Sequence, residues 1–175
     1  DIRHHGSGNA GATNTFRVLG KVAGTIVLII DVFKGWLVVN FVYLFSSINI
    51  NPELIFEYQL LFGFFAVVGH LFPVYTRFRG GKGIATLLGL LIGLHSFSAF
   101  VSCMVFIIVL LAFRYVSLAS IFSAIAFPII IYFFSESSDV SLIIFSIFVP
   151  LLALSTHHKN IRRLLRGQER KIKFK

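Results

Sequence analysis

Three polar segments of the sequence combine glycine, hydroxyl, amide and basic side chains at close spacing. They read GSGNAGATNTFR (residues 6–17), TRFRGGKGIAT (residues 76–86) and THHKNIRRLLRGQE (residues 156–169). Glycines let backbone N–H groups approach an anion closely, while Lys and Arg supply full positive charge. This combination is typical of a site for one or two phosphate groups. Because it is rich in donors and poor in bases, it suits acyl or phosphoryl transfer between anionic substrates.

Nucleotide-binding motifs fit these segments poorly. Glycines 6, 8 and 11 spell GxGxxG, but a dinucleotide loop needs a strand before it, and we expect none before Gly6. Asp31 has the spacing of the ribose-binding acid, yet it lies inside an apolar run. Lys82 is followed by a glycine, so the GxxxxGK[ST] phosphate loop is also absent. Nucleotide binding is therefore not indicated.

Metal and redox chemistry are not indicated either. The histidine pairs at positions 4–5 and 157–158 are adjacent in sequence rather than spaced along one helix face, and no cysteine joins them. Asp1 and Glu169 are the only carboxylates near the three segments, which argues against a two-metal site. Cys103, the single cysteine, is expected to be a small buried hydrophobe. We expect no metal and no cofactor.

The elements that must position these segments are apolar helices. Of the 175 residues 57% are apolar and only 13% are charged, against about 25% charged residues in soluble domains. Mean hydropathy is +0.88. The sequence lacks the ten-residue alternation of an outer-membrane barrel. It predicts an all-α, polytopic membrane protein with one domain over residues 1–175, and it argues against a nucleic-acid partner.

Long apolar runs predict where the helices lie. We expect helices at about 22–45 and 54–75, then a longer run at 84–113, and two more helices at about 116–134 and 140–155. The sequence SSININ separates the first two of these helices, and SESSD separates the last two. About 20 residues are enough to cross the ~30 Å hydrocarbon core of a bilayer.

The run at 84–113 has two interpretations, one long tilted helix or two helices that turn near His95. A single crossing would put Arg114 and the basic tail opposite the other basic segments, against the positive-inside rule. Two crossings place fifteen of the sixteen Lys and Arg residues, all but Lys34, on one face. We therefore predict six transmembrane helices, with three polar loops converging on the cytoplasmic face.

The basic tail is predicted to lie at the membrane surface. Ile161, Leu164 and Leu165 stand among its arginines. This pattern has two interpretations that it supports equally: an interfacial helix, or a generic attraction of the basic tail to anionic lipid.

In order and spacing, the three segments resemble the signatures of the bacterial acyl-phosphate-dependent glycerol-3-phosphate acyltransferases, the PlsY family. The matching patterns are GSGNxGATNxxR (6–17), FPVxxxFxGGKGxAT (72–86) and HxxNIxRLxxGxE (157–169). Shorter matches are DxR at the start, DxxKG at 31–35 and RYVSLAS at 114–120. The resemblance covers nearly the whole chain.

This resemblance implies an integral inner-membrane enzyme. It would transfer a fatty acyl group from acyl phosphate to the 1-hydroxyl of glycerol 3-phosphate, giving lysophosphatidic acid and inorganic phosphate. It implies no nucleotide, coenzyme A or metal, and it makes the soluble enzyme that forms acyl phosphate a partner. Family members look like seven-helix proteins, so the initial helix is expected to be missing here. The alternative class is an anion transporter or lipid-binding protein, whose binding groups are expected near the bilayer midplane.

The resemblance assigns roles by position. The substrate-contacting set is Ser7, Arg17, Lys82, His157 and Asn160. The loop around glycerol 3-phosphate is Gly80, Gly81 and Gly83, and the residues that shape the first loop are Gly8, Asn9, Gly11 and Asn14. Structural roles fall to Asp31, Lys34 and Glu169.

Several of these roles leave an alternative open. His157 is either a general base or a hydrogen-bond donor to a phosphate group. We favour the hydrogen-bond donor because no nearby carboxylate orients the ring. Ser7 is a nucleophile or a hydrogen-bond donor, and the absence of a His–acid pair in reach favours the donor. Asp31 and Lys34, three residues apart, form a structural ion pair or contribute to the site. Glu169 is expected to tether nearby basic residues.

Overall fold

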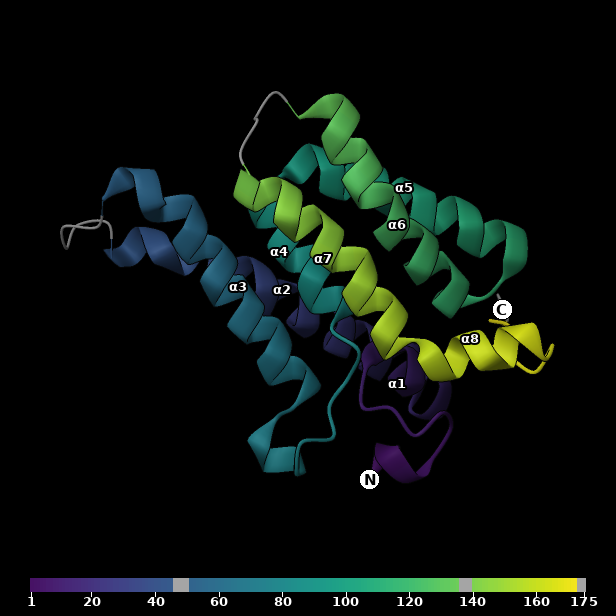
Figure 1. Cartoon of the computed structure of the whole chain (residues 1–175). Helices are drawn as coiled ribbons and strands as arrows, with labels where there is room; N and C mark the ends of the chain where they lie inside the picture. The colour runs from purple at the N-terminus through teal and green to yellow at the C-terminus, as the bar shows by residue number, and fades with distance from the viewer. Residues whose placement is uncertain (46–50, 136–139, 173–175) are drawn as a thin grey trace. The chain divides into compact units, whose positions relative to one another are not determined.

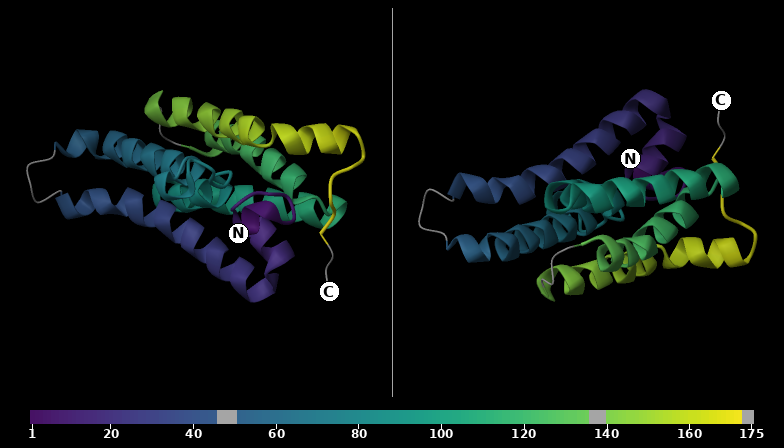
Figure 2. Two further views of the ribbon diagram at one scale, coloured as in Figure 1. Left: turned by 90° about the horizontal axis from the view of Figure 1, so that it is seen from below. Right: turned by 90° about the horizontal axis from the view of Figure 1, so that it is seen from above.

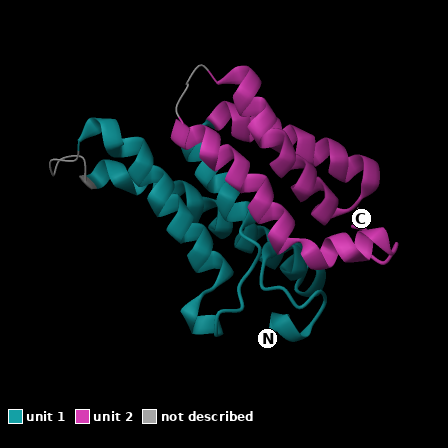
Figure 3. Cartoon of the chain, viewed as in Figure 1, with its two compact units in different colours: residues 1–95 teal, residues 96–175 magenta. Residues whose placement is uncertain are grey.

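The computed structural model describes residues 1–45, 51–135 and 140–172, and within these ranges it contains helices and no strands. This confirms the all-α prediction. Most of the SSININ and SESSD sequences lies outside the described residues. The chain divides into two compact units, Asp1–His95 and Ser96–Lys175 (Figure 3). The division into units does not test whether residues 1–175 form a single domain, which stays a prediction.

The first unit is built around one long helix. Its elements are η1 (Ile2–His4), α1 (Ala12–Val18), α2 (Gly20–Phe45), η2 (Pro52–Leu54), α3 (Ile55–Leu71), η3 (Val74–Thr76) and α4 (Ile84–Leu94). Helix α2 contacts α1, α3 and α4, and it runs beside α3 in Figures 1 and 2. The predicted first two helices are confirmed, whereas the short helix α1 falls in a segment for which the sequence suggested only a polar loop.

Helices α2 and α4 approach each other so closely that glycine is required at their crossing. A Cβ added to Gly89 on α4 would lie 1.8 Å from the carbonyl oxygen of Val32 on α2. A Cβ added to Gly35 on α2 would lie 2.1 Å from the carbonyl oxygen of Thr86 on α4. Small residues permit such backbone contacts between membrane helices. The close packing fixes α4, and therefore the loop that precedes it, against α2.

The second unit consists of α5 (Ser96–Phe113), α6 (Val116–Phe134), α7 (Val140–Thr156) and α8 (His158–Leu165). Helix α6 contacts α5 and α7, and its buried Phe127 meets Phe145 of α7 edge-on at 6.2 Å. Helix α8 bends away from α7 by 63°. Because α4 ends at Leu94 and α5 begins at Ser96, the predicted division of the long apolar run near His95 is confirmed.

Several helices have the length and apolarity to cross a bilayer. In the described residues these spans are Gly20–Leu44, Pro52–Thr76, Ser96–Phe113 and Val116–Phe134, and a fifth if α7 and α8 count as one bent span. Helix α4, with 11 residues, is apolar but shorter. The chain is therefore a multi-pass membrane protein, while the count of six crossings stays a prediction.

Candidate functional site

Asn14 organises the first polar segment. Its side chain is buried, 1% exposed, and its Oδ1 accepts a hydrogen bond from the Ser7 backbone N–H at 2.7 Å. Its Nδ2 donates to the carbonyls of Ile2 at 3.2 Å and His5 at 3.1 Å. A Cβ on Gly6 would lie 2.2 Å from Asn14 Oδ1, so the turn requires glycine there. Asn14 thus shapes the loop from inside, and Ser7 is held through its backbone.

Asn9 joins the first polar segment to the second. Its Oδ1 accepts from the Gly11 N–H at 2.9 Å, and its Nδ2 donates to the carbonyl of Gly80 at 3.5 Å. A Cβ placed on Gly11 would lie 3.9 Å from the Cα of Gly81. Gly8 has φ +75°, a conformation that favours glycine. The two glycine-containing loops therefore lie beside each other within the first unit.

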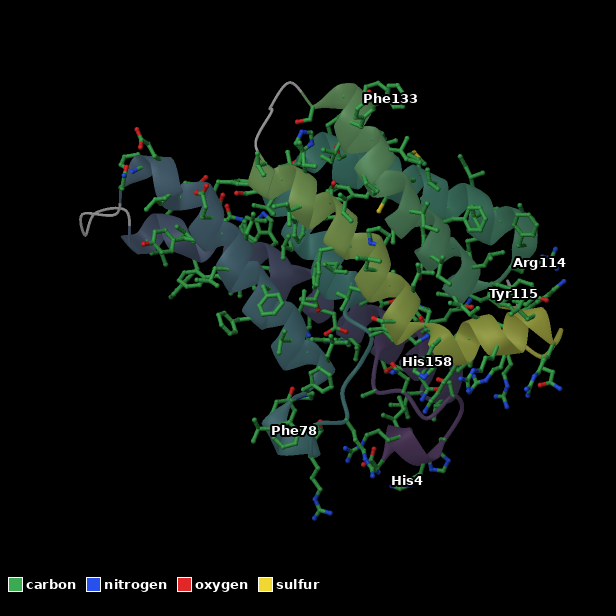
Figure 4. All side chains as sticks on the ribbon, viewed as in Figure 1. His4, Phe78, Arg114, Tyr115, Phe133 and His158 are labelled. Carbon is green, nitrogen blue, oxygen red and sulfur yellow. The ribbon has the colours of Figure 1, made fainter. Side chains whose placement is uncertain are left out.

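Arg3, which lies just before the first polar segment, makes a second connection to the second segment. Its guanidinium pairs with the Asp1 carboxylate and donates to the carbonyl of Thr76 at 2.6 Å. Thr76 Oγ1 in turn donates within its own turn, to the carbonyls of Pro73 and Arg79. Figure 4 labels His4 and Phe78, which mark the two connected turns.

The glycine loop, residues 80–83, is attached to the end of α3 through backbone hydrogen bonds. The N–H of Gly80 donates to the Leu71 carbonyl and the N–H of Gly81 donates to the His70 carbonyl, both at 3.1 Å. A Cβ on Gly80 would lie 2.0 Å from the His70 oxygen. Gly83 has φ +80° and is the N-cap of α4. This geometry explains why three glycines occur in the loop.

The loop presents Lys82 immediately before the N-terminus of α4. The side chain is half-buried, whereas Arg17 stands exposed in the last turn of α1. A helix N-terminus carries partial positive charge and backbone donors that favour an anion. Lysine adds a point charge, and arginine adds a planar fork suited to bidentate phosphate contacts.

The predicted ion pair between Asp31 and Lys34 is present in α2, with Oδ1 and Nζ 2.6 Å apart. A third group joins it: His70 Nδ1 lies 2.5 Å from Lys34 Nζ and 3.4 Å from Asp31 Oδ1. His70 belongs to the last turn of α3, and its side chain is 10% exposed. The sequence interpretation did not single out His70.

His157, in the second unit, is buried at the junction of α7 and α8 with 3% exposure. Its Nδ1–H donates to the carbonyl of Ala153 at 2.8 Å, since a carbonyl oxygen can only accept. A backbone carbonyl rather than a carboxylate therefore orients the ring. The neighbouring His158 is exposed (Figure 4).

Glu169 orients Asn160. Its Oε1 accepts from Asn160 Nδ2 at 2.7 Å and from Ser117 Oγ at 3.0 Å. Both of these partners are neutral donors, and the expected tether to basic residues stays a prediction. Ser117 lies in the first turn of α6, where partial positive charge favours a carboxylate.

The C-terminal segment also returns to the start of α6. The Ile172 N–H donates to the Arg114 carbonyl at 2.8 Å, and Lys171 Nζ lies 5.4 Å from the centre of the Tyr115 ring. Arg114 and Tyr115 are labelled in Figure 4. These contacts hold the third polar segment within the second unit.

The first and second polar segments therefore meet in one unit, and the third belongs to the other. Convergence of all three stays a prediction. In the described ranges, no three His, Cys, Asp or Glu side chains are grouped so that they could hold a metal ion.

Comparisons with known proteins agree with the family suggested by the sequence. A sequence profile of the glycerol-3-phosphate acyltransferase family matches residues 1–167. The chain is 42% identical to a glycerol-3-phosphate acyltransferase of Staphylococcus aureus (strain Newman), over 99% of this chain and 85% of that protein. It is 41% identical to one from Chlorobium phaeobacteroides, over 99% and 86%.

Two solved structures are also similar. The crystal structure of PlsY (YgiH), an integral membrane glycerol 3-phosphate acyltransferase, in its glycerol 3-phosphate form has a TM-score of 0.84 and 35% identity. The match covers 99% of this chain and 82% of that one. The lysophosphatidic acid form has a TM-score of 0.80 and 34% identity, covering 95% and 81%.

Proposed function

Because this chain belongs to the glycerol-3-phosphate acyltransferase family, we propose that it transfers a fatty acyl group from acyl phosphate to the 1-hydroxyl of glycerol 3-phosphate. The hydroxyl oxygen attacks the acyl carbonyl carbon. The bond between that carbon and the phosphate oxygen breaks, and the phosphate leaves with the electron pair. The hydroxyl proton passes to the leaving phosphate. The products are lysophosphatidic acid and inorganic phosphate.

The observation that carries this proposal is the meeting of two glycine-containing loops in the first unit, at Asn9 and Gly80. A reaction between two phosphorylated substrates needs two phosphate-binding sets of hydrogen-bond donors and cations side by side. The glycine loop with Lys82 would bind glycerol 3-phosphate. The first loop, with Ser7 as a hydrogen-bond donor and Arg17 as a planar cation, would bind the other phosphate. Holding both substrates in line replaces a bimolecular encounter and supplies much of the rate.

His157 and Asn160 would complete the site from the third polar segment. With Nδ1–H committed to the Ala153 carbonyl, His157 would meet the substrate through Nε2, and as an imidazolium it would donate to a phosphate oxygen. Asn160 is fixed by Glu169, so its amide would enter the site with a set orientation. In this role neither residue has to remove a proton from glycerol.

The proposed setting is the bacterial inner membrane. Six transmembrane helices would bring the three polar segments together at the cytoplasmic face, within one acyltransferase domain. A site at the surface suits both substrates, because glycerol 3-phosphate arrives from water and the acyl chain arrives from lipid. A soluble enzyme that forms acyl phosphate would supply the donor.

The test is a purified-enzyme assay with palmitoyl phosphate and glycerol 3-phosphate, following inorganic phosphate and lysophosphatidic acid. Lys82→Ala is expected to lower kcat/KM by about 10²–10³, as removal of a charge-stabilising donor does elsewhere. Lys21→Ala is the matched control, since it removes the same charge from the first turn of α2, outside the three polar segments. Near-normal turnover in Lys82→Ala would refute the role of Lys82. Substrate flux into vesicles without product would instead indicate a transporter.

A further inference from the structure

We propose that His70 is a positioning residue that sets the glycine loop for glycerol 3-phosphate, with the Asp31–Lys34 ion pair fixing its ring. This inference rests on the proposed function. Its basis is that one imidazole touches both a part-buried ion pair on α2 and the glycine loop between α3 and α4.

Lys34 determines which nitrogen of His70 carries the proton. Nζ lies 2.6 Å from Asp31 Oδ1 and 2.5 Å from His70 Nδ1. An ammonium group has donors and no lone pair, so Nδ1 must accept, and the ring proton of the neutral imidazole lies on Nε2. Asp31 Oδ1 also faces this nitrogen, but at 3.4 Å it is farther away than Lys34 Nζ. The ion pair therefore selects one tautomer and one ring orientation.

The opposite edge of the ring lies against the glycine loop. A Cβ on Gly81 would come 2.0 Å from His70 Nε2, 2.7 Å from Cε1 and 3.1 Å from Cδ2, and these ring atoms are its three nearest neighbours. The backbone of the same histidine accepts the Gly81 N–H at 3.1 Å. His70 thus holds Gly81 from two sides, through its carbonyl and through its ring.

Gly81 directly precedes Lys82, so the ring supports the loop at the point where its cation is presented. If the ring is removed, the carbonyl contact remains but the loop can move into the vacated space. A displacement of about 1 Å in a positioning group can cost about 10²-fold in rate. Binding of glycerol 3-phosphate, the substrate of this loop, should weaken, whereas binding of acyl phosphate should not change.

The first test compares His70→Ala and His70→Asn in the purified full chain, with both substrates varied. Asn offers a side-chain oxygen to Lys34 but places no ring under Gly81. In both variants we expect KM for glycerol 3-phosphate to rise tenfold or more, while KM for palmitoyl phosphate stays within twofold of wild type. A purely structural role would lower the folded yield and apparent kcat and leave both KM values unchanged. That result would overturn the proposal.

The second test uses two neighbouring glycines as a matched pair. Gly81→Ala should impair glycerol 3-phosphate binding because its Cβ meets the His70 ring. In a His70→Ala background that obstacle is absent. The fold increase in KM for glycerol 3-phosphate that Gly81→Ala causes should therefore be at least five times smaller there than in the wild-type background. Gly80→Ala is the control, because its Cβ would meet the backbone oxygens of His70 and Leu71, which His70→Ala retains. Neither glycine has positive φ, so alanine adds no backbone strain at either position and acts only through the new Cβ contact.

Equal relief at both glycines, or none at Gly81, would contradict the proposal even if a His70 variant folded poorly. Failure of the proposed function has a different signature. In that case wild-type protein forms no lysophosphatidic acid from the two substrates, whereas failure of this inference leaves wild-type turnover intact and the His70 variants with unchanged KM values.

Discussion

Replacing Gly89 with alanine should destabilise the first unit strongly. The new Cβ would lie 1.8 Å from the Val32 carbonyl oxygen and 2.9 Å from the Trp36 backbone nitrogen. To lengthen the first contact to 3.0 Å, below which real Cβ atoms essentially never approach, α2 and α4 must move apart by 1.2 Å. Overpacking typically costs about 1–3 kcal/mol, and an obstacle made of helix backbone places Gly89→Ala at roughly the upper end of that range.

Thermal unfolding in detergent would measure this cost. For a chain of this size, a loss of about 3 kcal/mol lowers the unfolding midpoint by roughly 6–12 °C. Circular dichroism can follow the unfolding, because the described elements of the first unit are helices. Gly69→Ala is the matched control: no atom lies within 4 Å of its added Cβ, and alanine is favoured over glycine within a helix by about 0.5–1 kcal/mol. Equal midpoints for the Gly89→Ala, Gly69→Ala and wild-type proteins would refute the close α2–α4 crossing.

Three further predictions concern the polar segments. Asn14→Ala leaves three backbone groups without their side-chain partner, so the free energy of unfolding should fall by about 1–3 kcal/mol. Turnover and folded yield should fall with it. A variant with wild-type stability would contradict the role of Asn14 in holding the loop. Glu169→Gln keeps an acceptor oxygen for Asn160 and should retain more kcat than Glu169→Ala, and equal kcat for the two variants would show that this contact does not position Asn160. His157→Gln retains an amide donor near the Nε2 position but cannot take up a proton. Activity within about tenfold of wild type is expected for a donor, whereas a loss of about 10²–10⁴ would identify a general base.

The membrane helices follow from the sequence because apolar length and charge are both visible there. The turn at His95 was predicted only from the distribution of basic residues, since hydropathy alone reads 84–113 as one run. Helix α1 was missed because its seven residues, ATNTFRV, include weak helix formers and no apolar periodicity. Tertiary contacts compensate, most directly through the buried amide of Asn14.

The candidate site was only partly predictable. The number of crossings and the distribution of basic residues indicated that segments 6–17 and 76–86 belong to one face, and their contacts within the first unit agree with this. The particular hydrogen bonds were not predictable, because those of Arg3 and Asn9 between the segments end on backbone carbonyls, which carry no residue-type signal. Glu169 was assigned basic partners because arginines are its sequence neighbours, yet Ser117 reaches it from another helix.

His70 shows most clearly what the sequence leaves out. A lone histidine at the end of an apolar run is typical of a helix that reaches the interface, so nothing marks it as part of a site. The pair formed by Asp31 and Lys34 was visible because three residues separate them in a helix. Lys34 and His70 are 36 positions apart and meet only because α3 packs against α2.

The most direct test of the central claim is one measurement on the purified chain: lysophosphatidic acid and inorganic phosphate formed from palmitoyl phosphate, with and without glycerol 3-phosphate. The proposed reaction predicts that both products appear in equal amounts and only when glycerol 3-phosphate is present. Phosphate release that does not depend on glycerol 3-phosphate, or no lysophosphatidic acid from a folded protein with both substrates, would contradict the account.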